Sequence, residues 1–369
     1  MRPLRLMTVI GTRPEAIKLA PVILAARACP AEFDVRVVRT GQHRELVDEL
    51  LAEFGIDAHV DLNIMQPDQE PAHVLSASVR GLSDVIAAER PDWVLVQGDT
   101  TTTLAGALAA FYGKTPVGHV EAGLRTGDRR CPFPEETNRT LTTHVADLHF
   151  APTARAQLNL LREGIGPARI VLTGNTVVDA LLHARHLNAR EGLPAVSAPY
   201  FLVTAHRREN HGDALMRICD AVREILLRHP CAQAWIPMHP HPAVRRVWSE
   251  RLGGHERALL GEPLGYTAFV RALEGASLVL TDSGGIQEEC AALGKPVLVM
   301  REHTERPEAV DAGVARLVGT GVEAIVEAAS SLLDDPGRRE AMARSTDVFG
   351  DGRASQRILA ALSSAARPR

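Results

Sequence analysis

Eight short apolar runs, rich in β-branched residues, alternate with longer amphipathic segments along this chain. They lie at residues 6–10, 34–39, 93–97, 116–120, 201–204, 234–237, 278–281 and 296–300. This alternation is typical of βαβ units around a buried parallel sheet. Because 369 residues exceed what one hydrophobic core usually holds, two domains are expected. We therefore predict an α/β fold with two domains, each built on a parallel sheet.

The strand series restarts after Thr173, which gives the predicted domain boundary. We assign residues 1–172 to an N-terminal domain and residues 173–352 to a C-terminal domain, with an irregular Ala-, Gly- and Pro-rich connection at 189–199. Residues 353–369 are predicted to form a helix with Ile358, Leu359 and Leu362 on one face. In a two-domain fold of this kind, such a helix is expected to pack back on the first domain.

Composition excludes several classes of protein. The formal net charge of −4 offers no basic field for a nucleic-acid backbone, and no apolar run approaches the roughly 18 residues that a membrane span needs. The five cysteines are an odd number without a CxxC pair, which argues against a zinc knuckle and a disulfide framework. We expect a cytoplasmic enzyme that binds neither nucleic acid nor membrane.

Three familiar cofactor-binding or metal-binding patterns are absent or incomplete in this chain. The turn after the first strand, residues 11–15, lacks the GxGxxG pattern of dinucleotide enzymes. A P-loop ending near Gly113 would need glycine where Leu108 stands. The pair His239 and His241 lacks a third nearby metal ligand, which favours a structural or anion-contacting role. The prediction is an enzyme with no metal and no cofactor.

Residues 282–285 read Asp-Ser-Gly-Gly and join an apolar strand to a helical segment. Free backbone N–H groups and the positive end of the helix dipole make such a start a diphosphate site, with Ser283 and the glycines beside it. Glu289 lies about one and a half turns further along, where it could bond ribose hydroxyls. The alternative is an ordinary cap by Ser283 with Glu289 on the surface.

Three carboxylates follow or flank strands of the first domain, namely Asp99, Glu121 and Glu135. Carboxylates near arginines suit acid and base work beside a diphosphate. Structural alternatives remain open for each of them. Asp99 could cap the helix after Thr100, Glu121 could pair with Arg125, and Glu135 or Glu136 could pair with Arg139 on a helix face.

Taken together, these motifs resemble the non-hydrolysing UDP-N-acetylglucosamine 2-epimerases. The similar segments span nearly the whole chain: residues 11–18, 98–103, 119–127, 134–139, 173–176, 205–210, 282–289 and 304–308. The resemblance implies the GT-B fold, with two Rossmann-like domains, an active site in the interdomain cleft, and a homodimer. It implies interconversion of UDP-GlcNAc and UDP-ManNAc, with UDP as a further ligand. Alternatives are a GT-B glycosyltransferase using a UDP-sugar donor, a hydrolysing epimerase and a non-catalytic UDP-sugar sensor.

The resemblance also implies roles for single residues. Asp99, Glu121, Glu135 and His206 correspond to catalytic positions, and the substrate-binding positions are Arg13, Lys18, Phe269, Ser283, Gly284, Gly285, Glu289 and Arg306. A second, activating UDP-GlcNAc site corresponds to Gln42, His43, Gln69, Glu136, Arg207 and His239. Two positions depart from the pattern: Leu264 replaces a Gln found near the base in some relatives, and His241 replaces the usual Asn.

Overall fold

A computed structural model describes residues 2–41, 44–65, 70–187, 199–207 and 210–365 of the chain. The chain divides into two compact units. Unit 1 comprises Met1–His183 and Gly350–Arg369, and unit 2 comprises Ala184–Phe349. The division falls near the end of the helix Thr176–His186, not at residue 172 as the strand series suggested, because this helix continues without a break from the first unit.

Unit 1 is a parallel sheet covered by helices on both faces. Its strands are β1 (Leu4–Ile10), β2 (Phe33–Arg39), β3 (Val60–Asp61), β4 (Trp93–Gln97), β5 (Val117–Val120), β6 (Leu148–Ala151) and β7 (Ile170–Leu172), in the order β3-β2-β1-β4-β5-β6-β7. Its helices are α1 (Arg13–Arg27), α2 (Arg44–Glu53), α3 (Pro71–Glu89), α4 (Thr101–Tyr112), α5 (Glu135–Val145), α6 (Ala154–Arg162), α7 (Thr176–His186) and α15 (Ala354–Ser364), with a 3-10 turn at Pro167–Arg169.

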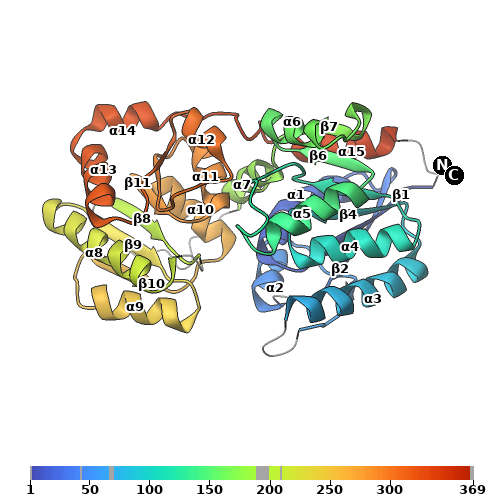
Figure 1. The fold of residues 1–369 in the computed structure, drawn as a ribbon, viewed down its shortest axis with the longest axis horizontal. Coiled ribbons are helices and arrows are strands. Elements are labelled where there is room, and N and C mark those ends of the chain that lie inside the picture. The colour runs from blue at the N-terminus through green and yellow to red at the C-terminus, as the bar shows by residue number, and fades with distance from the viewer. Residues whose placement is uncertain (1, 42–43, 66–69, 188–198, 208–209, 366–369) are drawn as a thin grey trace. The chain divides into compact units, whose positions relative to one another are not determined.

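Helix α4 forms the centre of one helical layer of unit 1, between α3 and α5 (Figure 1). It starts at Thr100, whose hydroxyl accepts a 3.0 Å hydrogen bond from the Thr103 N–H, as an N-cap does. Its small side chains allow a close approach to the sheet, so that Gly106 packs against Val96 of β4 and Val9 of β1. The layer and the sheet share one apolar core.

The last helix, α15, belongs to unit 1 and packs against α1. It buries Ile358, Leu359 and Leu362, the apolar face that the sequence indicates. The Asp179 carboxylate of α7 accepts hydrogen bonds from the first two N–H groups of α15, Ala354 at 3.2 Å and Ser355 at 2.8 Å. These bonds satisfy donors that a helix start otherwise leaves unpaired.

Unit 2 is a second, six-stranded parallel sheet. Its strands are β8 (Tyr200–Thr204), β9 (Gln233–Pro237), β10 (Ala258–Gly261), β11 (Leu278–Thr281), β12 (Val297–Val299) and β13 (Ala315–Leu317), in the order β10-β9-β8-β11-β12-β13. Its helices are α8 (Asp213–Arg228), α9 (Pro242–Leu252), α10 (Tyr266–Gly275), α11 (Gly284–Leu293), α12 (Pro307–Asp311), α13 (Val322–Asp334) and α14 (Pro336–Met342).

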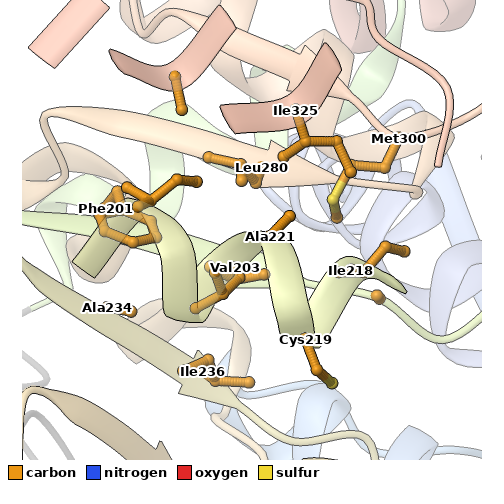
Figure 2. Packing of buried hydrophobic residues seen from close by; sticks show 14 of the residues in the cluster. Phe201, Val203, Ile218, Cys219, Ala221, Ala234, Ile236, Leu280, Met300 and Ile325 are labelled. Atoms are coloured by element: carbon orange, nitrogen blue, oxygen red, sulfur yellow. The ribbon is translucent and has the colours of Figure 1, made fainter. Parts of the chain in front are cut away.

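The core of unit 2 forms where α8 and α13 cover the sheet (Figure 2). Val203 of β8 lies beside Ala221 of α8, and Ile325 of α13 lies beside Leu280 of β11, in one cluster with Phe201 and Ile218. Each of these side chains is fully buried. Alternate residues of β8 point to this face, as strand geometry requires.

All eight predicted strands are confirmed, and β4 and β11 begin and end at the predicted residues. The prediction of two domains built on parallel sheets is also confirmed. Five short strands were missed: β3, β6, β7, β10 and β13. Within the described residues no helix is long and apolar enough to span a membrane. The five cysteines all carry free thiols.

His119 and His149 lie opposite each other on β5 and β6, and both are fully buried. A ring nitrogen of His119, Nε2, lies 2.7 Å from the Gly98 carbonyl, whereas neither ring nitrogen of His149 has a hydrogen-bond partner in the described chain. Burial lowers the pKa of His119 to about 4 and that of His149 to about 3. Both imidazoles are therefore neutral at pH 7.

We expect the unfolding free energy to fall as pH drops from about 6.5 towards 4. Unfolded histidines take up protons in this window and these two folded ones do not, so the unfolded state gains stability on acidification. In His149→Leu the urea midpoint should depend less on pH between 7.5 and 5, while the exposed His144→Leu should keep the wild-type dependence. Identical slopes in His149→Leu and wild type would show that the buried imidazole does not titrate on unfolding.

Candidate active site

The strand order reverses at β1 and β4 in unit 1, and the turns after these two strands are joined by Glu15. One carboxylate oxygen of Glu15 accepts the N–H groups of Gly11, at 3.0 Å, and Thr12, at 2.7 Å. The other accepts the Thr100 hydroxyl at 2.7 Å. The side chain is completely buried, and burial raises its pKa although these bonds oppose the rise. Glu15 therefore locks the turn carrying Arg13 to the turn that follows β4.

Glu121 lies directly after β5 and is almost completely buried. Its carboxylate accepts hydrogen bonds from Lys18 Nζ and Asn175 Nδ2 on one oxygen, the latter at 3.0 Å, and from Gln97 Nε2 on the other. Its backbone is left-handed, with φ of 64°, which costs a non-glycine residue about 1–2 kcal/mol. Strain at a buried, fully bonded carboxylate is typical of a functional position.

Asp99 follows β4, the strand next to β5, and is half-buried. Its carboxylate pairs with the Arg139 guanidinium, and its carbonyl accepts the Asn138 side-chain amide at 3.1 Å. Both partners belong to α5, which begins at Glu135. These contacts bring the half-buried Glu135 to the same sheet edge as Asp99 and Glu121.

The structural alternatives for these carboxylates are resolved in unit 1. Thr100, not Asp99, caps α4. Arg125 makes a two-pronged ion pair with Glu163, at 2.6 and 2.7 Å, and Glu121 pairs with Lys18 instead. Lys18, a substrate-binding position by resemblance, is buried and pairs with the Glu121 carboxylate.

Glu136 was assigned to the second UDP-GlcNAc site by resemblance, and its side chain is buried in unit 1. It accepts the backbone N–H groups of Thr126 and Gly127 at 3.0 and 3.1 Å and lies 3.2 Å from an Arg139 nitrogen. The carboxylate therefore holds the loop before α5.

In unit 2 the strand order reverses at β8 and β11, and a buried carboxylate again joins the two turns. One oxygen of Asp282 accepts the backbone N–H groups of His206 and Arg207, both at 2.9 Å, and the Asn210 amide at 3.0 Å. The other lies 3.6 Å from His206 Nδ1. Asp282 thus orients the half-buried His206 beside the start of α11, a role that the sequence motif alone did not reveal.

Helix α11 begins directly after Ser283, at the predicted diphosphate position. Ser283 is its N-cap residue by position, yet its side chain makes no capping hydrogen bond to the helix. A Cβ added at Gly285 would meet no atom within 4 Å, so the first turn is open at this residue. Glu289 is 4% exposed, which contradicts the alternative of a surface carboxylate.

Arg306 packs over the start of α11, where a Cβ on Gly284 would lie 2.7 Å from its guanidinium. The guanidinium is paired with Glu288 at 3.0 Å and with Glu305 at 2.6 Å. Burial raises the pKa of Glu305, but the guanidinium groups of Arg306 and Arg301 more than offset this and hold it well below its usual value. A side chain at position 284 would displace this paired guanidinium.

Four histidines gather after β8 and β9. His206 stacks on His239 with ring centroids 5.2 Å apart and planes at 7°, and His211 lies 5.4 Å from His241. Among the described residues no group of three or more His, Cys, Asp or Glu side chains has metal-binding geometry.

The remaining predicted residues are placed as follows. Phe269 is half-buried on α10, close in sequence to the half-buried Leu264. Arg207 lies 3.8 Å from Glu305. Gln42, His43 and Gln69 lie outside the described residues.

A cavity of about 440 Å³ at the ends of β12 and β13 is lined by Arg301, Arg316 and Arg338 among others, and by none of the predicted site residues.

The sequence of this chain matches a known protein family over most of its length. The profile of the UDP-N-acetylglucosamine 2-epimerase family matches residues 26–363. The chain belongs to this family. It is 49% identical to the UDP-N-acetylglucosamine 2-epimerase of Escherichia coli K12, over 97% of this chain and 98% of that protein. The Bacillus subtilis enzyme is 46% identical over 97% and 95% of the two chains.

Solved structures agree with this family assignment. The UDP-GlcNAc 2-epimerase of Neisseria meningitidis, bound to UDP-GlcNAc, has a TM-score of 0.93 and 43% identity over 97% of this chain and 99% of that one. The glycosyltransferase SnogD of Streptomyces nogalater, 19% identical with a TM-score of 0.62, shares the fold alone, covering 98% of this chain and 100% of that one. Both agree with the GT-B fold that the resemblance implied.

Glu15 and Asn175 were not predicted as functional positions from the sequence. Glu15 lies three residues after Thr12, the spacing of a capping box, and this signal could have identified it. Asn175 lies far from Glu121 in sequence, and no local pattern connects them.

Proposed function

We propose that this chain interconverts UDP-GlcNAc and UDP-ManNAc as a non-hydrolysing 2-epimerase without metal or nicotinamide. The observation that carries the proposal is Glu121, a buried carboxylate in strained backbone, with Asp99 just after the neighbouring strand β4. The Neisseria meningitidis relative, whose structure contains bound UDP-GlcNAc, supports the choice of substrate.

The nucleotide binds at unit 2. The start of α11, with Ser283 and Gly285, receives the diphosphate, because free N–H groups and the helix dipole favour an anion there. Glu289 bonds the ribose and Phe269 contacts the uracil. His206, oriented by Asp282, approaches the diphosphate.

The reaction begins with loss of UDP, because the C2 hydrogen is not adjacent to a carbonyl and is otherwise too weakly acidic. Cleavage of the C1–O bond leaves its electron pair on UDP and gives oxocarbenium character at C1. A carboxylate base then removes the C2 proton, giving a 2-acetamidoglucal. Arg13, His206 and the α11 terminus stabilise the charge on the departing diphosphate.

The epimer forms when a proton returns to the opposite face of C2 and UDP adds again at C1. Two faces require two proton carriers, which explains why Asp99, Glu121 and Glu135 share one sheet edge. The product supplies ManNAc units for surface polysaccharides. The homodimer and the second UDP-GlcNAc site stay predictions.

Incubation with UDP-GlcNAc in D₂O, followed by NMR, tests the proposal. We expect UDP-ManNAc carrying deuterium at C2, formed without added NAD or metal and insensitive to EDTA. Full retention of the C2 hydrogen would eliminate the mechanism. Free ManNAc would indicate a hydrolysing enzyme, transfer to an added acceptor a glycosyltransferase, and binding without turnover a sensor.

A further inference from the structure

Asn175 links the start of α7 to Glu121. It is 1% exposed, and both ends of its amide are used. Its Oδ1 accepts the Val177 N–H at 3.1 Å, which caps α7, while its Nδ2 donates to Glu121 Oε1 at 3.0 Å. One side chain therefore combines a helix cap with a contact to the buried carboxylate.

The turn that carries Asn175 is held by the returning end of the chain. Gly350, with φ of 114°, packs so closely that a Cβ there would lie 2.9 Å from the Gly174 Cα. Arg357 of α15 donates to the Thr173 carbonyl at 2.9 Å. The C-terminal segment thus contacts both residues that precede Asn175.

We propose that Asn175, whose turn is contacted by the segment 350–357, is a positioning residue for Glu121. The inference rests on the proposed function. Glu121 Oε1 also accepts Lys18, whose flexible ammonium supplies charge with little directionality. The planar amide of Asn175, fixed by its second bond to α7, orients the Oε1 side of this carboxylate, while Gln97 Nε2 holds Oε2.

Two substitutions separate the positioning contact from the helix cap. Asn175→Ser and Asn175→Asp both keep a side-chain oxygen that caps α7, because Ser and Asp are favoured caps. Ser lacks the amide Nδ2 that donates to Glu121, and we expect kcat to fall about 10-fold with KM nearly unchanged. Asp sets a second carboxylate against Glu121, and we expect a loss of about 100-fold that diminishes at lower pH, where the introduced carboxyl group protonates and can donate.

The matched control is Thr153→Ala, which removes the cap of α6, where the Thr153 hydroxyl accepts the Ala156 N–H at 3.1 Å. This variant should lose stability as a cap deletion does while its kcat stays within about twofold of wild type. A kcat for Asn175→Ser within about twofold of wild type would overturn the proposal. So would an equal loss of kcat in Thr153→Ala.

A double-mutant cycle tests the contact without any activity assay. Asn175→Ser, Glu121→Ala and the double variant are compared by hydrogen exchange of β5 peptides across a urea series. We expect the two substitutions to be coupled by about fivefold or more in the unfolding equilibrium constant. Absence of coupling would overturn the positioning role. If the wild type does not epimerise UDP-GlcNAc, the proposed function fails, while the cycle still decides whether Asn175 holds Glu121.

Discussion

Asp99→Asn, Glu121→Gln and Glu135→Gln should each lower kcat about 100-fold or more. A positioned acid or base contributes on this scale, and an amide of the same shape transfers no proton. UDP affinity should change little, since none of these three carboxylates is a proposed nucleotide contact. NMR rates in both directions and calorimetric titration with UDP measure the two quantities separately.

Glu163→Gln is the matched control for these variants. Glu163 is also a unit 1 carboxylate in an ion pair, here with Arg125, but it carries no proposed proton. Its kcat should stay within about twofold of wild type. Near-normal turnover in all three test variants would remove the case for carboxylate proton carriers. If only one variant kept a near-normal kcat, the proton transfers would be assigned to the other two carboxylates.

Glu289→Ala should weaken UDP binding by about 1.5–3 kcal/mol, roughly 10- to 150-fold in Kd. Hydrogen bonds to a charged group contribute a binding free energy of this size. Because the ribose contacts are made equally in the ground and transition states, their loss weakens binding of the nucleotide. Glu289→Gln keeps one acceptor oxygen and should give an intermediate loss. Calorimetry with UDP measures both variants.

The control for the ribose assignment is Glu262→Ala, which removes an exposed unit 2 carboxylate paired with Arg245. In this variant UDP affinity should be unchanged, because an exposed ion pair contributes little even to the stability of the protein. Unchanged UDP binding in a folded Glu289→Ala variant would show that the ribose binds elsewhere. Circular dichroism of each variant establishes that it is folded.

The central strands were predictable because each is buried on both faces. Such strands appear as continuous apolar runs, and β4 and β11 begin and end as predicted. The missed strands have two to four residues. Four of them, β3, β7, β10 and β13, form the edges of the two sheets, and β6 lies next to an edge. Their short length leaves too little periodicity, and pairing with a neighbour defines them as strands.

The choice of ion-pair partner was not predictable from local spacing. Arg125 follows Glu121 by four residues, yet the chain leaves β5 through a turn, and Arg125 reaches Glu163 at the C-terminal end of α6. Lys18 reaches Glu121 from α1. Separation in sequence predicts side-chain contact only inside one regular helix.

By itself, the sequence determined the two parallel sheets, the turns that carry polar residues and the family to which the chain belongs. These properties depend on local hydrophobic pattern and on motifs of a few residues. Only the tertiary structure decided which groups meet: Glu15 and Asp282 each join two turns, and Asn175 bonds Glu121 across 54 positions. The physical reason is that parallel strands bring their carboxyl ends to one sheet edge, so the partners of a buried charge come from segments far apart in the chain.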